Sequence, residues 1–354
     1  MQNGVVKLKN LVEKLIARED LGESETAFAI DELLTFDVST VSTDPDMQAL
    51  AFQIPAFLTL LRSKGETAEE VWGIVKGLRS KGVTIRCQRR VLDIVGTGGD
   101  GMHTVNISTG ASILAAACGV PMAKHGNRSV SSMCGSADVL EEFGVNLDLS
   151  AEGVKRCIDE LGMGFCFAQK FHPAMRKVRE IRKGLGVPTV FNLIGPLLNP
   201  ALSEHHLIGV YDPAFLDLFA GVLVKAGAKH SMVFHGQALD ELSPLGPAQV
   251  AEVLDDGTIK HWTLDPKDYD ISYCKLEDLK GGPPSENASL LMQTFEGKKG
   301  PIADTLALNA GVALWCYGSA PSIKEGVEAA REALQAKKAK DLLAKWVALS
   351  KQLT

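Results

Sequence analysis

Three short segments of this 354-residue chain combine residue types that bind phosphate and the cation that accompanies it. The first is a turn after the apolar run VLDIV, with glycine at Gly96, Gly98, Gly99 and Gly101. Because glycine has no side chain, backbone N–H groups in such a turn can close on an anion. Asn106, Ser108 and Thr109 then open an apolar helix, whose first N–H groups and dipole favour negative charge.

The second segment, KHGNRSVSS, follows the apolar run VPMA. Lys124 and Arg128 supply positive charge for phosphate, and hydroxyl donors follow at Ser129, Ser131 and Ser132. Asn127 could bond a ring or a carboxylate, whereas His125 could equally hold the loop together. Two anion-binding loops after consecutive strands indicate a ligand with phosphates at both ends, such as a phosphorylated sugar.

The third segment places Asp240 and Glu241 just after the predicted strand SMVFHG. Ligands of open α/β sheets bind at the carboxyl ends of the strands. A diphosphate ester carries Mg²⁺, which prefers oxygen ligands and retains several waters, so these carboxylates and the Ser108 hydroxyl are candidate metal ligands. Adjacent acids in loops are usually only solvated, and the residues alone leave both interpretations open.

The chemistry that these segments favour is transfer at the anomeric carbon of a phosphorylated sugar, with metal-bound diphosphate as leaving group. Such a reaction needs alignment and leaving-group stabilisation more than a strong base. The sequence shows no isolated Ser-His-Asp arrangement and no carboxylate pair suited to glycoside hydrolysis. Arg182 lies near a helix end, where it could be solvated or could meet an acidic substrate, and Pro196 is a candidate wall for a flat ring.

The elements that position these segments fall into two parts. Residues 5–81 show helical periodicity, and Pro55 is expected to kink or divide one helix. After Arg89, apolar strands alternate with helices, which predicts a mostly parallel central sheet flanked by helices; residues 249–253 and 259–262 predict a hairpin on it. We therefore expect a small all-helical N-terminal domain, residues 1–85, and a larger α/β domain, residues 86–354.

Composition restricts the class of function and the compartment. A net charge of −6 argues against a generic nucleic-acid surface. The seven cysteines occur singly, as is typical of reduced thiols in a cytosol-like compartment. No apolar run approaches the ~20 residues that cross a bilayer, and the N-terminus resembles no signal peptide. We expect a cytoplasmic protein, or one of the plastid stroma if a transit peptide has been removed, without membrane or nucleic-acid partners.

Taken together, the motifs resemble those of the anthranilate phosphoribosyltransferase family, which joins anthranilate to phosphoribosyl pyrophosphate in tryptophan biosynthesis. The matching motifs, from about residue 7 to residue 350 and in that family's order, are DIVGTGGDG, NIST, KHGNRSVSS, GSADVLE, HPAM, FNLIGPLLNP and LDELSPLG. The resemblance implies Mg²⁺ as cofactor and a homodimer formed through the helical domain. It also implies that residues of about 172–186 rejoin the helical domain in space.

The resemblance assigns roles to individual residues. Anthranilate contacts are implied for Gly96, Asn127 and Arg182, with Arg182 pairing the carboxylate, and Mg²⁺ ligation for Ser108, Asp240 and Glu241. The implied phosphoribosyl pyrophosphate site comprises Gly96, Gly99, Asp100, Thr104, Asn106, Ile107, Ser108, Thr109, Lys124, His125, Gly126, Asn127, Arg128, Ser129, Val130, Ser131, Ser132 and Ser136. Small departures from the family pattern, at Cys134 and Ala238 and in AQKFHPAM, remove no expected functional group.

Two other functions remain open on sequence grounds. A pyrimidine nucleoside phosphorylase would share the architecture and a glycine- and lysine-containing phosphate site, but its use of inorganic phosphate needs no pair such as Asp240–Glu241. Nucleic-acid-binding relatives of the fold should be basic and lack parts of the substrate site. The net charge of −6 and the complete series of motifs disfavour them.

Overall fold

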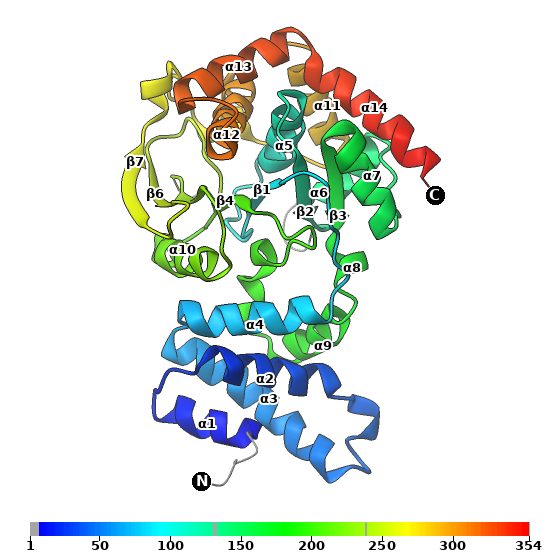
Figure 1. Ribbon diagram of the computed structural model, residues 1–354, viewed down its shortest axis with the longest axis vertical. Helices are drawn as coiled ribbons and strands as arrows, with labels where there is room; N and C mark the ends of the chain where they lie inside the picture. Colours follow the sequence, from blue (N-terminus) through cyan, green and yellow to red (C-terminus); the bar gives the residue numbers. More distant parts are fainter. Residues whose placement is uncertain (1–6, 130–132, 238, 354) are drawn as a thin grey trace. The chain divides into compact units, whose positions relative to one another are not determined.

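The computed structural model describes residues 7–129, 133–237 and 239–353 of the chain (Figure 1). It forms two compact units, one of residues 1–83 and 172–198 and the other of residues 84–171 and 199–354. The segment that returns to the first unit thus extends to residue 198. None of the helices in the described ranges is long and apolar enough to cross a membrane.

The first unit is helical. Its elements are α1 (Leu8–Ile16), α2 (Glu23–Thr35), η1 (Val38–Thr40), α3 (Pro45–Lys64), α4 (Ala68–Ser80), α9 (Met175–Leu185), η2 (Val190–Asn192) and η3 (Gly195–Leu197). Helix α3 is continuous through Pro55 and is not divided there. Helix α4 begins with a capping box, in which Thr67 and Glu70 bond each other's backbone N–H groups and satisfy two donors that a helix start leaves open.

The second unit contains a seven-stranded sheet in the order β3-β2-β1-β4-β5-β6-β7. The strands are β1 (Leu92–Gly96), β2 (Met122–Gly126), β3 (Met163–Phe167), β4 (His205–Gly209), β5 (Ser231–His235), β6 (Ala248–Val253) and β7 (Ile259–Leu264). Strands β1 to β5 pair in parallel, and β6 and β7 form the predicted antiparallel hairpin beside β5. The predicted fold class, a helical domain with a mostly parallel α/β domain, is confirmed.

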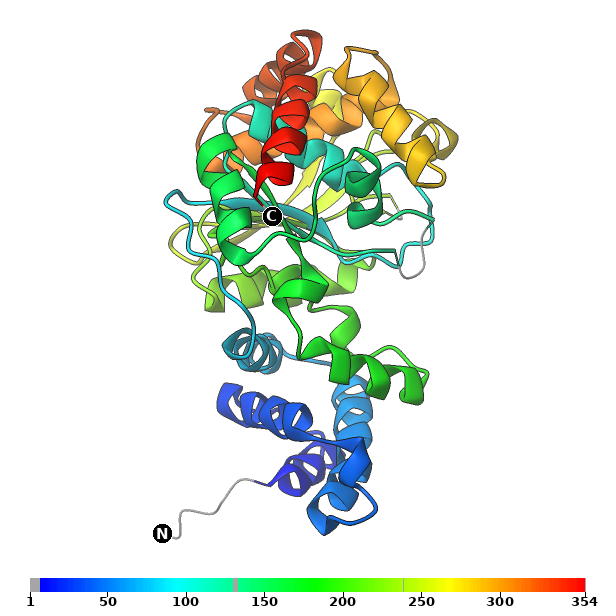
Figure 2. The same cartoon turned by 90° about the vertical axis from the view of Figure 1, so that its right-hand side faces the viewer.

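Helices cover both faces of this sheet. Helices α5, α12, α13 and α14 lie on one face and α10 on the other (Figures 1 and 2). The helices of the unit are α5 (Ile107–Ala117), α6 (Ser136–Glu142), α7 (Ala151–Leu161), α8 (Ala168–Phe171), α10 (Leu216–Lys225), α11 (Pro284–Phe295), α12 (Pro301–Tyr317), α13 (Ile323–Gln335) and α14 (Lys338–Gln352). Short 3₁₀ turns add η4 (Pro213–Phe215), η5 (Pro266–Tyr269) and η6 (Leu276–Leu279). Helix α5 is buried almost throughout, which explains its run of alanine, leucine and isoleucine.

The chain connections reverse direction at β1. From β1 the chain proceeds through β2 to β3 on one side, and β4 then returns to the other side of β1. Such a switch point leaves a crevice at the carboxyl ends of the strands, where open α/β sheets bind ligands. Gly96 ends β1 and Gly209 ends β4, so the predicted glycine-rich turn starts at this crevice.

Candidate active site at the carboxyl ends of β1, β2 and β4

Asp240 lies at the switch point, above the ends of β1 and β4. Its Oδ2 accepts the backbone N–H of Gly98 at 2.5 Å. A Cβ atom on Gly96 would overlap the Asp240 carboxylate, and one on Gly209 would overlap the Asp240 backbone carbonyl. Glycine at the ends of both strands is therefore needed to admit this acid into the crevice.

Glu241 reaches the start of helix α5. Its Oε1 accepts the backbone N–H of Ser108 at 3.1 Å. Its Oε2 is buried and has no hydrogen-bond partner among the described residues. A buried carboxylate oxygen without a partner is costly, so Oε2 is suited to bind a ligand.

The electrostatics of the acid pair point to a cation. Burial, and to a smaller extent the nearby negative charge of Asp100, raises the pKa of Asp240 to about 7. Burial, followed by the charge of Asp240, raises the pKa of Glu241 to about 8. Two buried carboxylates that repel each other are stabilised when a positive charge enters between them.

The residues present fit Mg²⁺ as part of its coordination shell. Asp240 and Glu241 offer carboxylate oxygens. Ser108 offers a hydroxyl oxygen, and the backbone N–H of the same residue donates to Glu241. Within the described chain no group of three or more His, Cys, Asp or Glu residues could hold a metal ion. Magnesium commonly binds through one or two carboxylates, substrate phosphates and water, so a cluster of that kind is not required.

Lys124, the cation predicted in the second segment, lies beside these acids. It is only 2% exposed, and its Nζ donates to the Ile94 carbonyl at 2.8 Å and to Ser108 Oγ at 3.4 Å. Burial lowers its pKa, while the negative charges of Asp93, Glu241 and Asp240 act in the opposite direction.

The glycine-rich turn is held on both sides. Gly98, Gly99 and Gly101 adopt positive φ angles of 72°, 87° and 69°, which other residues rarely adopt. Asp100 accepts the Met102 N–H at 3.0 Å, closing the turn on itself. Thr104 forms an isolated antiparallel β-bridge with Lys280. The Lys280 Nζ also donates to the Met102 carbonyl at 2.7 Å.

The start of helix α5 is tied to the chain around it. Asn106 occupies the N-cap position, but its side chain makes no capping hydrogen bond. Instead its Nδ2 donates to the Cys134 carbonyl at 3.0 Å, and its Oδ1 accepts from Asn287 at 2.9 Å. Ile107 and Thr109 are buried and contribute to packing. Of the first N–H groups of α5, that of Ile107 donates to the Val105 carbonyl at 2.6 Å and that of Ser108 to Glu241.

The loop after β2 contains the remaining predicted phosphate residues. His125 is buried and its N–H donates to Asp93 at 3.2 Å, which agrees with a role in holding the loop. Asn127 Oδ1 accepts from the Arg128 N–H at 2.8 Å and from Gln169 at 3.1 Å. Gly126 packs against Ser136, whose hydroxyl donates to the Asn127 carbonyl at 3.2 Å.

Arg128 points to acids of helix α6. It forms two hydrogen bonds to Glu141, at 2.5 and 2.7 Å, and one to Asp138 at 3.3 Å. The Ser129 N–H donates to Asp138 at 3.0 Å. The predicted phosphate contacts Val130, Ser131 and Ser132, and the family departure at Ala238, lie outside the described residues.

Arg182 belongs to the helical unit, near the end of α9. It is partly buried. This burial, and to a smaller extent the positive charge of Arg179, lowers its pKa. Among the described residues it has no ion-pair partner. A partly buried guanidinium without a carboxylate is suited to an acidic ligand.

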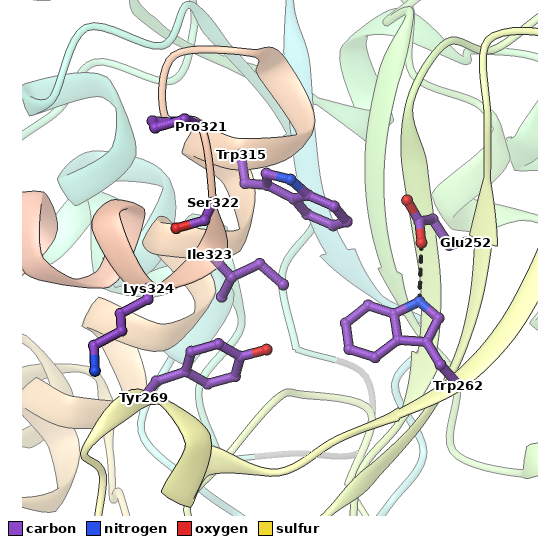
Figure 3. Close-up of a pocket in the computed structure, with 8 residues that line it drawn as sticks. All are labelled: Glu252, Trp262, Tyr269, Trp315, Pro321, Ser322, Ile323 and Lys324. Atoms are coloured by element: carbon purple, nitrogen blue, oxygen red, sulfur yellow. Dashed lines mark hydrogen bonds between the residues drawn. The ribbon is translucent and has the colours of Figure 1, made fainter.

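A separate cavity of about 400 Å³ lies in the α/β unit, and Figure 3 shows its lining. Trp262 and Trp315 form aromatic walls, and Trp262 Nε1 donates to Glu252 at 3.0 Å. Glu252 pairs with Met232 near the amino end of β5, whereas Asp240 follows the carboxyl end of that strand. The eight lining residues include none of the predicted site residues.

Several residues of the site were not predicted. They are Asp93, Asn199, Gly209, Lys280 and Asn287. An aspartate inside the apolar run VLDIV was the available signal for Asp93, since acids are rarely buried without a partner. The other four gave no local signal, because their roles depend on contacts with distant parts of the chain.

Comparisons with known proteins agree with this fold. Residues 88–340 match the α/β domain of a glycosyl transferase family, and residues 9–82 match its helical bundle domain. The anthranilate phosphoribosyltransferase of Chlamydia caviae is 47% identical over 302 residues, which are 85% of this chain and 88% of the relative. The crystal structure of the Thermus thermophilus enzyme is similar with a TM-score of 0.87 and 42% identity, covering 96% of this chain and 99% of that one.

A more distant structure is that of the anthranilate phosphoribosyltransferase of Saccharomyces cerevisiae in complex with phosphoribosyl pyrophosphate and Mg. It has a TM-score of 0.86 and 27% identity, and the match covers 98% of each chain. Another structure of the yeast protein contains 4-fluoroanthranilate. By the extent of these matches, the chain belongs to the anthranilate phosphoribosyltransferase family.

Proposed function

We propose that the site around Asp240, Glu241 and Lys124 carries out the reaction of this family. The protein transfers the phosphoribosyl group of phosphoribosyl pyrophosphate to the amine of anthranilate, giving N-(5-phosphoribosyl)anthranilate and pyrophosphate in tryptophan biosynthesis. The observation that carries the assignment of the site is the buried acid pair. Asp240 enters over Gly96, and Glu241 presents an unbonded oxygen beside Ser108 and Lys124.

The residues at the switch point hold the leaving group. Ser108, Asp240 and Glu241 would hold Mg²⁺, which supplies charge that neutralises the departing diphosphate. The Lys124 ammonium adds a positive charge in a buried site, where electrostatic interactions are strong. The N–H groups of the glycine-rich turn offer donors to the phosphates, and the Arg128 guanidinium and the Ser136 hydroxyl in the loop after β2 offer further donors.

The acceptor needs orientation rather than activation. The aromatic amine of anthranilate is neutral near pH 7, so its lone pair can attack C1 of the ribose as the C1–O bond to diphosphate breaks. The ribose ring passes through an oxocarbenium-like state, and the amine then releases its proton. Arg182 pairs the anthranilate carboxylate, with Gly96 and Asn127 as further contacts. The assignment is supported by the partly buried guanidinium, which has no carboxylate partner in the part of the chain that the structure describes.

The proposal extends to a homodimer formed through the helical unit and a location in the cytoplasm or plastid stroma. An apolar groove of about 250 Å³ within that unit, lined in part by Ile54 and Ile181, supports the dimer. Phe52 on α3 is 79% exposed, which leaves a large apolar side chain for a partner to cover. Light scattering on the purified protein tests the dimer, and a monomer would contradict it.

The activity is tested by following anthranilate fluorescence with protein, phosphoribosyl pyrophosphate and Mg²⁺, with EDTA as control. Loss of signal that requires all components is expected. An unchanged signal from folded protein would contradict the proposal, and phosphorolysis of thymidine or uridine would then identify a nucleoside phosphorylase.

A further inference from the structure

Strands β1 and β2 separate after their first residues. Both strands lie wholly within the described chain, yet the only residues paired between them are Leu92 and Met122. By contrast, β1 pairs with β4 along the whole of Leu92–Gly96, and β2 pairs with β3 along the whole of Met122–Gly126. The sheet is therefore open at one seam, and the seam leads to the site.

Two buried side chains form hydrogen bonds with backbone groups of β2 where β1 and β2 are not paired. Asp93 of β1 accepts the His125 N–H of β2 at 3.2 Å through Oδ1. Its Oδ2 accepts from Asn199 Nδ2 at 2.7 Å. The same amide nitrogen donates to the Ala123 carbonyl of β2 at 2.7 Å. Asp93 and Asn199 thus form a polar bridge across the seam in place of backbone pairing.

Lys124 occupies the opening that the bridge creates. Its ammonium donates to the Ile94 carbonyl of β1 at 2.8 Å, a group that a closed ladder would use, and lies 3.4 Å from Ser108 Oγ. Asp93 and Asn199 are fully buried. Polar groups so deeply buried usually stabilise a sheet less than apolar side chains of the same volume would. Their presence in this seam is explained if the seam has to stay open.

We propose that Asp93 and Asn199 are positioning residues for phosphoribosyl transfer: they hold β1 and β2 apart and thereby hold the Lys124 ammonium where it meets the substrate diphosphate. This inference rests on the proposed function of the site. Both residues act through Lys124.

The test is the variant Asp93→Asn, which keeps the shape of the side chain. Its amide oxygen can still accept the His125 N–H, but its NH₂ group faces the NH₂ group of Asn199, and the charge opposite Lys124 is lost. We expect the KM for phosphoribosyl pyrophosphate to rise at least about tenfold, with the KM for anthranilate unchanged. Titration calorimetry with inorganic pyrophosphate and Mg²⁺ should show a parallel loss of affinity.

Two further variants separate positioning from general loss of stability. Asn199→Ala removes the bridge to Ala123 while leaving Asp93 and its charge, so we expect the same split between the two KM values. Asn146→Ala removes a hydrogen bond to the Ser350 carbonyl elsewhere in the α/β unit and should leave both KM values unchanged. If Asp93→Asn does not fold, Asn199→Ala decides the question by the same measurements.

The outcomes of the two proposals are distinguishable. Wild-type protein without turnover would contradict the proposed function, and the pyrophosphate titrations would still compare wild type with the variants. Active wild type together with folded variants that keep the wild-type KM for phosphoribosyl pyrophosphate and the wild-type pyrophosphate affinity would overturn the positioning role.

Discussion

The carboxylate of Asp240 occupies the space that a side chain on Gly96 would fill. The two residues are far apart in sequence, yet the Gly98 N–H in the turn after Gly96 donates to Asp240 at 2.5 Å. The glycine-rich turn and the acid proposed as a metal ligand therefore depend on each other. A change in either should disturb both the binding of phosphate and the binding of metal.

Gly96→Ala should displace Asp240 and weaken the site. Because the added Cβ overlaps the carboxylate, we expect ~1–3 kcal/mol of destabilisation and a clear rise in the Mg²⁺ concentration that gives half-maximal activity. Gly22→Ala is the matched control, since a Cβ at that position meets only Glu25 Oε2, at 3.8 Å. It should leave the dependence of activity on Mg²⁺ unchanged. Thermal unfolding and Mg²⁺ titrations of activity check both variants; wild-type metal dependence in Gly96→Ala would contradict the expectation.

Glu241→Gln should separate stability from metal binding. The amide oxygen can still accept the Ser108 N–H, while a buried carboxylate with an unbonded oxygen is removed. We expect the metal-free variant to be at least as stable as wild type, with the stabilisation by Mg²⁺ and pyrophosphate largely lost. Thermal unfolding with and without these ligands measures the effect.

Glu252→Gln is the control for that experiment. Glu252 is as buried as Glu241, at 8% exposure, but it is bonded by His230 and Trp262. Its replacement should lower stability without changing the response to Mg²⁺. If Glu241→Gln instead lost stability and kept the metal response, its assignment as a ligand would be wrong.

The sequence predicted the parts of the site that local chemistry determines. A glycine-rich turn needs the backbone freedom that Gly98, Gly99 and Gly101 use, and a polar residue before an apolar helix marks the start of α5. Alternating apolar runs predicted the parallel sheet, because buried strands and crossover helices have distinct periodicities. The adjacent acids at Asp240 and Glu241 became a specific prediction only through the resemblance to a family.

The polar bridge could not be predicted in the same way. Asp93 and Asn199 are 106 residues apart, and their contact depends on how β2 lies against β1. Residue propensities and spacing cannot predict that two strands separate when both sequences are apolar and uninterrupted. The continuity of α3 through Pro55 is a comparable case, since the packing of Ile54 and Phe57 in the helical core outweighs the local preference to break.

Arg182→Ala should act on the acceptor substrate alone. The partly buried guanidinium has no carboxylate partner in the described chain, and we expect its loss to raise the KM for anthranilate by about tenfold or more. Arg182→Lys should give an intermediate value, because lysine keeps the charge and loses the planar fork. Arg176→Ala, a change on the same helix, is the control. An unchanged KM for anthranilate in Arg182→Ala would remove the assigned role.

The stability of the α/β unit should include a contribution from neutral His205. Burial lowers the pKa of this imidazole from its ordinary value of 6.5, and its Nδ1 bonds the His230 carbonyl at 3.0 Å. The unfolded chain then binds a proton more readily than the folded one, so this contribution is complete above pH 6.5 and is lost as the pH falls below it.

His205→Phe checks this sign. The ring can still pack against Tyr317, so the variant is expected to be less stable at neutral pH but to lose less stability on acidification. Urea unfolding of both proteins at about pH 7.5 and about pH 5.5 gives the comparison. Equal losses in the two proteins would show that His205 is not the group responsible.

Glu141 should compete with phosphate for Arg128. The guanidinium forms two hydrogen bonds with Glu141, and its charge is therefore neutralised beside the site. An exposed pair of this kind contributes about 1 kcal/mol or less, so Glu141→Gln should lower the KM for phosphoribosyl pyrophosphate by no more than about fivefold.

Steady-state kinetics at two salt concentrations would test this effect of Glu141→Gln, since added salt should weaken the ion pair in wild type and reduce the difference in KM between the two proteins. A raised KM would instead show that Glu141 holds Arg128 in the orientation that phosphate needs, because freeing a correctly placed cation cannot weaken its own binding to an anion.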